Sequence, residues 1–193
     1  MAGLNTAGGE LLDFYEKRDE NRLHGIVSWI VDIIVMITLA VFVVHSFGSR
    51  AEMRGSSMRP VLESGDVVLM NRLVYDLGSP KRFDVVAFAK GDSTLNIRRV
   101  IGLPGETVQI TNGMVYINGE PLETENEQLS LAAIAGVAEY PVELGEDEYF
   151  LLGDNRDSSE DSRFEGTGNV SREQIVGKVW LKISPFQEMG RIG

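Results

Sequence analysis

The chain has 193 residues, enough for one compact domain of ordinary size plus a little over, which excludes a multidomain assembly. Lys and Arg total 18 against 29 Asp and Glu, and the net charge of −11 argues against binding of nucleic acid through a broad positively charged surface. With no cysteine, disulfides, thiolate zinc sites and a cysteine nucleophile are excluded, and only two histidines are present. We therefore expect no nucleic-acid partner, no metal and no cofactor.

Residues 26–47 are the longest apolar run, in which 17 of 22 positions are apolar and Asp32 is the one full charge. As a helix, this run spans about 33 Å, which is enough to cross a bilayer. It is too long for a cleaved secretion signal, and about 25 mostly polar residues precede it. We interpret residues 25–47 as an uncleaved transmembrane anchor in contact with membrane lipid. The alternative, a buried helix of a soluble core, would normally show a polar stripe.

Basic residues flank this anchor on both sides, with Lys17, Arg18 and Arg22 before it and Arg50 and Arg54 after it. Cytoplasmic segments next to a membrane span tend to carry the excess of Lys and Arg, whereas long domains cross largely regardless of charge. The bias predicts a single-pass plasma-membrane protein with residues 1–24 as a cytoplasmic tail and residues 48–193 outside the cytoplasm.

The segment after the anchor contains short β patterns separated by Gly, Pro, Asn or Asp. These patterns cover residues 67–75, 83–90, 96–103, 106–119, 146–154 and 175–183. The clearest is 107–119, where Asn-Gly pairs at 112–113 and 118–119 are typical of type I′ turns, whose two central residues both have positive φ. The predicted fold class is mainly β, with antiparallel sheets and one N-terminal transmembrane helix.

Residues 106–149 are expected to form a smaller acidic insertion in this β domain. Nine acidic residues and no Lys or Arg lie from Glu120 to Glu148. We interpret this run as a solvated face or mobile loop, with calcium binding as the poorer alternative.

Three loop-rich segments contain candidate site residues: 55–68, 96–106 and 151–166. Taken alone, Gly55-Ser56-Ser57-Met58 is a small-residue turn, and serine in turns is usually structural. The anchor ends about ten residues earlier and would hold Ser57 near the outer membrane surface, within reach of a membrane-spanning substrate.

In this order, and after an N-terminal anchor, the three segments resemble those of bacterial type I signal peptidases, which are membrane-bound Ser/Lys endopeptidases. Ser57-Met58-Arg59-Pro60 with Gly65-Asp66 resembles the nucleophile box of that family. Residues 99–105, RVIGLPG, resemble its lysine box, and GDNRD at 153–157 with DSR at 161–163 resembles its C-terminal box. The resemblance covers nearly the whole outer domain.

The resemblance implies a role for each matching residue. Ser57 would attack the scissile carbonyl, and its own backbone N–H would help to hold the oxyanion. Met58 and Leu62 would wall a shallow apolar pocket for small side chains, which fits Ala-x-Ala cleavage sites. Gly55 stands where some relatives place a second hydroxyl donor. Ser159 would orient the base, and Asp161 with Arg163 would form a structural ion pair that holds the loop.

The sequence departs from the family pattern at the general base, because Arg98 occupies the lysine position. Lowering the pKa of an arginine to near neutrality would cost roughly 8 kcal/mol, and guanidinium is not deprotonated in proteins. Arg98 therefore cannot take a proton from Ser57 as lysine would. Other candidate bases are weaker, since they are distant in sequence, poorly basic or usually non-catalytic in relatives; they are Lys90, Lys178, Lys182, Asp157, Asp161, His24 and His45.

Two functional hypotheses follow from this substitution. In the first, the chain is a signal peptidase I-type serine endopeptidase that removes N-terminal signal peptides from secretory precursors at small-x-small sites. In the second, it is a catalytically impaired member of the family, a membrane-tethered binding or assembly factor that keeps the groove and uses Arg98 as a fixed charge. The intact serine and flanking boxes favour the first.

Overall fold

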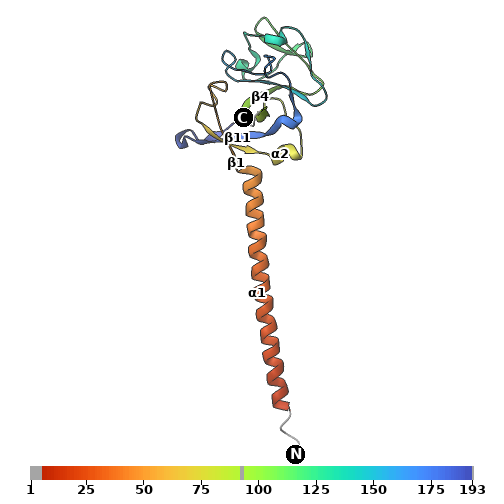
Figure 1. Ribbon diagram of the computed structural model, residues 1–193, viewed down its shortest axis with the longest axis vertical. Coiled ribbons are helices and arrows are strands. Elements are labelled where there is room, and N and C mark those ends of the chain that lie inside the picture. The colour runs from red at the N-terminus through yellow and green to blue at the C-terminus, as the bar shows by residue number, and fades with distance from the viewer. Residues whose placement is uncertain (1–5, 92–93, 193) are drawn as a thin grey trace, which may run out of the picture. The chain divides into compact units, whose positions relative to one another are not determined.

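The computed structural model describes residues 6–91 and 94–192, so the first five residues of the predicted cytoplasmic tail lie outside it. Contacts divide the chain into a unit that ends at His45 and a second unit that begins at Ser46. In the described part of the first unit, the chain forms helix α1, Thr6–Phe47, which has 42 residues and whose last two residues belong to the second unit (Figure 1).

Helix α1 contains a window, His24–His45, that is long and apolar enough to cross a membrane, with a mean hydropathy of 2.7. None of this window is buried against the rest of the chain. The core helix of a soluble protein would pack its apolar side chains inside, so this exposure favours the anchor interpretation.

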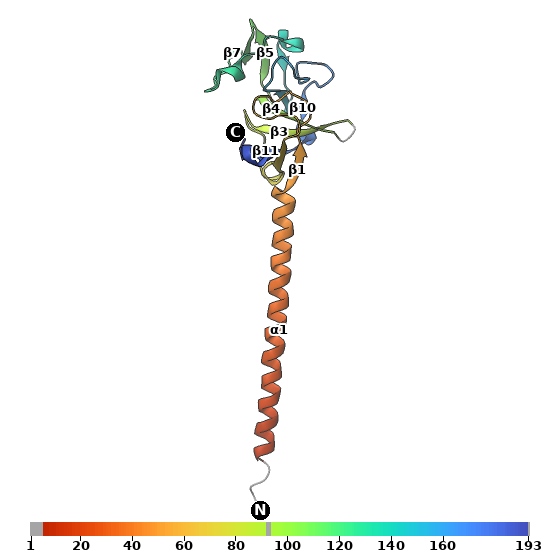
Figure 2. The same ribbon diagram turned by 90° about the vertical axis from the view of Figure 1, so that its left-hand side faces the viewer.

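The second unit is built around an eight-stranded antiparallel sheet (Figure 2). Its strand order is β1-β2-β11-β3-β4-β9-β10, and β12 pairs with β11. The strands are β1 Ser49–Glu52, β2 Val67–Asn71, β3 Val85–Lys90, β4 Thr94–Gly102, β9 Glu148–Leu152, β10 Val170–Ser171, β11 Ile175–Ser184 and β12 Gly190–Arg191. The sheet therefore brings the last long strand of the chain between two early ones, β2 and β3.

A second antiparallel sheet of four strands has the order β7-β6-β5-β8. Its strands are β5 Thr107–Thr111, β6 Met114–Ile117, β7 Glu120–Pro121 and β8 Val142–Glu143. The two Asn-Gly pairs have positive φ at both residues, 53° and 78° at 112–113 and 52° and 84° at 118–119, which confirms the predicted turn chemistry.

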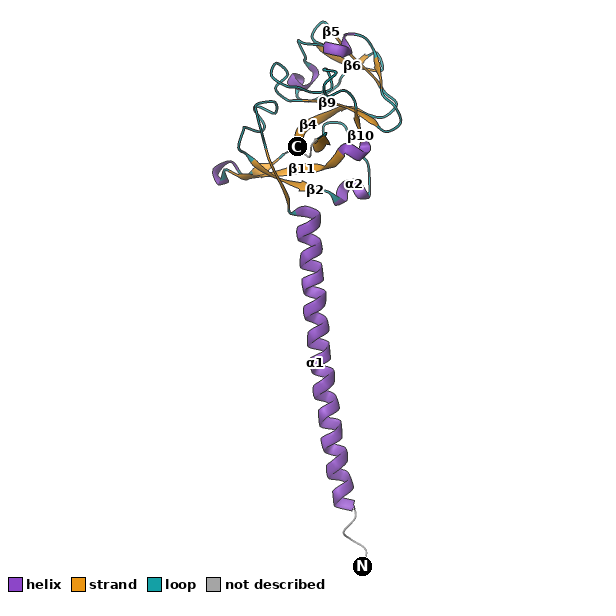
Figure 3. Ribbon diagram, in the orientation of Figure 1, coloured by secondary structure: helices purple, strands orange, loops and turns teal. Residues whose placement is uncertain are grey.

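Short helical elements connect these strands, and Figure 3 separates them from strands and loops by colour. They are α2 Leu73–Asp76 and the 3₁₀ turns η1 Glu127–Ser130, η2 Gly136–Glu139, η3 Arg172–Gln174 and η4 Phe186–Glu188. The prediction of a strand through residue 75 is wrong for its last part, because β2 ends at Asn71. The helical turn α2 buries Tyr75, whose hydroxyl donates to Asp84 at 2.9 Å.

The middle of the large sheet is covered on both faces. Along β3, Val85 and Ala87 belong to one core cluster, whereas Val86 and Phe88 belong to another on the opposite face. Successive side chains of a strand point to opposite faces, so a strand buried on both faces reads as a continuous apolar run. Its neighbour β4 lies in the same layer, and a charged residue there must find partners inside the protein.

Candidate active site

Ser57 lies in the turn between β1 and β2, and the residues after it fix this turn to the core. Met58 and Leu62 are fully buried in the cluster that contains Val68 and Val179, and the Leu62 amide donates to the Met58 carbonyl at 2.9 Å. Both side chains are thus core residues here, and their expected role as walls of a substrate pocket stays a prediction.

A second segment, residues 153–163, which we call the Ser159 loop, binds this turn directly. The Asn155 amide donates to the Ser57 carbonyl at 3.0 Å, and the Asn155 side-chain amide donates to the Ser56 carbonyl at 3.0 Å. Gly153, the first residue of the loop, is the point of close approach to the Ser57 turn. A Cβ at Gly153 would stand 2.2 Å from Ser159 Oγ and 2.4 Å from the Ser57 carbonyl oxygen, so glycine permits this approach.

The hydroxyl oxygens of Ser57 and Ser159 are both buried, and neither has a hydrogen-bond partner. A buried polar group without a partner costs about 1–3 kcal/mol, and such groups in native structures call for an explanation such as a catalytic role. The resemblance assigns these two residues as nucleophile and orienting hydroxyl. The structure brings both next to Gly153.

Arg98 comes from β4 and binds the Ser159 loop through its guanidinium. Nη2 and Nε donate to the Glu160 carbonyl at 2.8 and 3.3 Å, and Nη1 donates to the Ile97 carbonyl at 2.6 Å. The side chain therefore reaches the residue next to Ser159 but makes no hydrogen bond to Ser57. Burial lowers the pKa of Arg98 from its usual value, whereas the charges of Asp161 and Glu160 oppose that change.

The predicted structural ion pair is formed inside the Ser159 loop. Arg163 Nε lies 2.8 Å from Asp161 Oδ1, Nη2 lies 2.9 Å from Oδ2, and both side chains are completely buried. Asp161 Oδ2 also accepts from the Gly153 amide at 3.0 Å. The pair thus binds the backbone of Gly153, where the two serine segments approach each other.

The remaining candidate residues lie elsewhere or are engaged. Gly55 has a φ of 78°, a conformation that suits glycine, and contributes no side chain. Lys90 Nζ donates to Thr167 Oγ1 at 3.1 Å. Strands β3 and β4 pair Lys90 with Thr94 and Val86 with Arg98, so Lys90 lies four residues along β3 from the residue opposite Arg98. At about 3.4 Å per residue, this separates the two positions by roughly 13 Å along the strand.

The late-strand lysines also have acidic partners. Lys178 Nζ lies 2.5 Å from Asp84, and Lys182 Nζ lies 2.7 Å from Asp66 and 2.6 Å from Glu188. These hydrogen bonds raise the pKa of Lys182, the larger effect coming from Asp66. A lysine held in its charged form is a poor proton acceptor. His24 and His45 belong to α1, in the unit that precedes Ser46.

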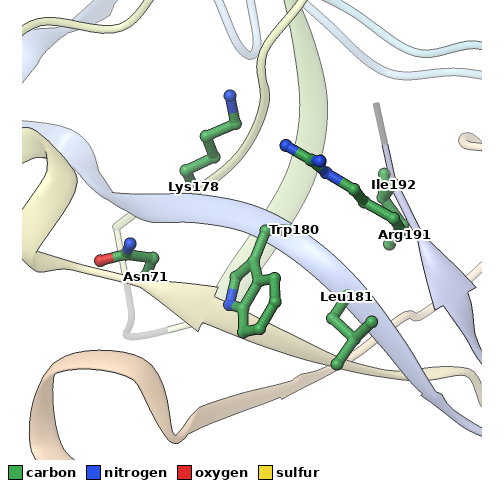
Figure 4. Close-up of a pocket in the computed structure, with 6 residues that line it drawn as sticks. All are labelled: Asn71, Lys178, Trp180, Leu181, Arg191 and Ile192. Atoms are coloured by element: carbon green, nitrogen blue, oxygen red, sulfur yellow. The ribbon is translucent and has the colours of Figure 1, made fainter. Parts of the chain in front are cut away.

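A pocket of about 640 Å³ opens beside β11; of the candidate residues only Lys178 lines it, and none of those that the resemblance assigns to the site does (Figure 4). It is lined by Asn71, Lys178, Trp180, Leu181, Arg191 and Ile192. The lining includes no serine. Among the residues that the structure describes, no group of three His, Asp or Glu side chains could hold a metal ion.

Three residues of the site were not singled out in the sequence: Gly153, Asn155 and Arg156. All three belong to the GDNRD run that carries the resemblance. The signal available in the sequence was that run itself, in which a glycine precedes polar residues directly after a strand. What it did not show is that Asn155 bonds to the serine turn, or that Arg156 is buried.

Comparison with known proteins gives consistent matches. The family model described as "Signal peptidase, peptidase S26" matches residues 26–183. Signal peptidase I of Bacillus caldolyticus is 36% identical over 174 residues, covering 83% of this chain and 90% of the relative. Signal peptidase I T of Bacillus subtilis (strain 168) is 33% identical, covering 90% and 93%. A crystal structure of a signal peptidase I from Enterococcus faecalis V583, 30% identical, covers 52% of this chain and 97% of that chain with a TM-score of 0.42.

Proposed function

Because this chain belongs to the signal peptidase I family of serine endopeptidases, we propose that it removes signal peptides from secretory precursors by attack of Ser57. The observation that carries the proposal is the buried, unpartnered hydroxyl of Ser57, in a turn that is bound by the Ser159 loop, which carries a second such hydroxyl. These relatives bear the name of an enzyme, and none of them supports the alternative of a binding or assembly factor.

The substrate is a precursor with a small-x-small cleavage site, presented at the membrane. Helix α1 anchors the chain in the plasma membrane, with residues 1–24 in the cytoplasm and residues 48–193 outside. The length and hydropathy of α1 support a membrane span, and the basic residues before it support this orientation. The scissile bond then lies beside Ser57 as the signal peptide occupies the bilayer.

Catalysis in this chain proceeds without a lysine base. The Ser57 oxygen bonds to the scissile carbonyl carbon, its proton leaves to hydroxide or water, and the oxyanion accepts from the Ser57 N–H. The C–N bond then breaks, the leaving amine takes a proton from water, and a second water hydrolyses the acyl-enzyme ester and restores the Ser57 hydroxyl. Arg98 stays protonated, because burial alone does not supply the roughly 8 kcal/mol that deprotonation near pH 7 requires. It acts as a fixed cation bound to the Glu160 carbonyl, holding the Ser159 loop against β4.

The test is cleavage of an Ala-x-Ala precursor by the full chain in detergent micelles, alongside Ser57→Ala and Arg98→Lys. A positioned general base contributes about 10²–10⁴-fold, so Arg98→Lys should cleave faster than the unaltered chain by that factor. Its rate should level off above the pKa of the new lysine, whereas the rate of the unaltered chain should keep rising with hydroxide. Ser57→Ala should abolish both activities.

A matched control is Arg82→Lys, since Arg82 is paired with Glu106 at 2.6 Å and does not touch the serines. It should give no gain in rate. Two results would contradict the proposal: cleavage that survives Ser57→Ala, or an Arg98→Lys variant that is folded and no faster than the unaltered chain.

A further inference from the structure

The four-stranded sheet contacts the Ser159 loop through residues 129–137, which run from the end of η1 to the start of η2 and which we call the brace. The Ala132 amide donates to the Gly113 carbonyl at 2.8 Å, and Leu131 forms an isolated bridge with Met114. Ala132 and the neighbouring Ala138 are buried in the core cluster of that sheet. One side of the brace is therefore fixed to the hairpin of β5 and β6.

On its other side, the brace is bound by the two buried arginines of the Ser159 loop. Arg156 Nη2 and Nη1 donate to the carbonyls of Leu129 and Leu131 at 2.8 and 3.0 Å. Arg163 Nη1 donates to the Ile134 carbonyl at 2.9 Å. Each guanidinium thus satisfies main-chain carbonyls of a segment that is more than twenty residues away in sequence.

The backbones of the brace and the loop also touch. The Val137 amide donates to the Arg163 carbonyl at 2.8 Å. Gly136, with a φ of 57°, packs so closely that a Cβ there would stand 2.1 Å from the Arg163 carbonyl oxygen. No side chain fits between the two segments at this point.

These contacts continue to the reactive hydroxyls. Arg163 donates to the Arg156 carbonyl at 2.8 Å and to both oxygens of Asp161, which in turn accepts from the Gly153 amide. A Cβ at Gly153 would meet both Ser159 Oγ and the Ser57 carbonyl oxygen, and the Asn155 amide donates to that carbonyl. Hydrogen bonds therefore connect the small sheet, through the brace and the Ser159 loop, to the turn that contains Ser57.

We propose that the four-stranded sheet positions the active site through the brace, and that Arg156 is the positioning residue that couples them. The inference rests on the proposed function, since it concerns the geometry of Ser57. It assigns a catalytic contribution to a sheet from which no reacting group comes. Without Arg156, the loop keeps its internal ion pair but loses two of the bonds that set its distance from the brace.

The first experiment places Arg156→Ala in the Arg98→Lys chain and measures precursor cleavage. A displacement of about 1 Å at a reacting group costs up to 10²-fold, so we expect kcat to fall roughly 10–100-fold while KM changes little. Millimolar guanidinium, which can occupy the vacated site, should recover part of kcat, and sodium chloride should not. Arg82→Ala is the control, because it removes a guanidinium from the same unit without touching the brace.

The second experiment needs no catalysis. Gly136→Ala and Gly119→Ala both place alanine at positive φ, 57° and 84°, but only the first puts a Cβ against the Ser159 loop, since nothing lies within 4 Å of a Cβ at Gly119. Hydrogen exchange of the loop amides, including those of Gly153 and Asn155, should accelerate in Gly136→Ala and not in Gly119→Ala.

Unchanged kcat in folded Arg156→Ala, equal loss in the Arg82→Ala control, or equal exchange in the two glycine variants would each overturn the inference. If Arg98→Lys itself does not cleave, the proposed function fails, and the exchange comparison still decides whether the brace holds the loop.

Discussion

Replacing Gly153 with alanine tests how closely the two serine segments must approach. The added Cβ would lie 2.4 Å from the Ser57 carbonyl oxygen, 2.2 Å from Ser159 Oγ and 2.6 Å from Ser159 Cβ. Ordinary contact begins near 3.5 Å, so the segments must separate by about 1 Å. Overpacking of this kind typically costs 1–3 kcal/mol. The same displacement should lower the cleavage rate by up to about 10²-fold.

Two measurements on one preparation check this reasoning. At roughly 2–4 °C per kcal/mol, the thermal midpoint of the β unit should fall by about 2–12 °C. Precursor cleavage is then measured well below that midpoint in the Arg98→Lys chain, so that unfolding does not lower the rate. Gly145→Ala is the control, because its Cβ would meet Glu148 only at 3.5 Å. A Gly153→Ala protein with an unchanged midpoint and a rate within threefold of its parent would refute the argument.

Two further predictions concern buried charges in the β unit. Asp161→Asn should lower the free energy of unfolding of the unit by about 3–5 kcal/mol, because it leaves the completely buried Arg163 without its counter-charge. Urea unfolding measures this loss of stability, and a loss below about 1 kcal/mol would contradict the prediction. Hydrogen bonds to Asp66 and Glu188 raise the pKa of Lys182 in the folded state. Its contribution to the free energy of unfolding is therefore complete at pH values below the pKa of lysine in the unfolded chain, near 10.4. That contribution is lost as the pH rises through the higher pKa of the folded state. Lys182→Met should therefore flatten the alkaline fall of the free energy of unfolding, and an unchanged alkaline limb in pH-dependent urea melts would count against this assignment.

Local patterns in the sequence predicted much of the fold. Strands β2, β3, β5, β6 and β9 lie within the predicted segments, β4 begins two residues before its segment, β11 ends one residue after its own, and the Asn-Gly hairpins formed as expected. These features depend on neighbouring residues, which is why one sequence suffices to find them. Strands β7, β8, β10 and β12 have two residues each, too few to show a period of two.

The candidate site was predictable in its residues but not in its supports. Ser57, Arg98 and Ser159 came from the resemblance, and the structure brings all three around the Ser159 loop. The bonds of Arg156 to the brace were not predictable, because their acceptors are main-chain carbonyls, which every residue type offers. Pairing between distant segments leaves no periodic pattern in the chain.

Strand β11 has a consequence for biosynthesis. It lies between β2 and β3, pairing with β2 on one side and with β3 and β12 on the other. While the ribosome is still making residues 175–184, both early strands expose unpaired edges, which are prone to join other chains. The large sheet is therefore completed only after nearly the whole polypeptide has emerged, and a message truncated before that strand would leave β2 and β3 without the strand that pairs with both.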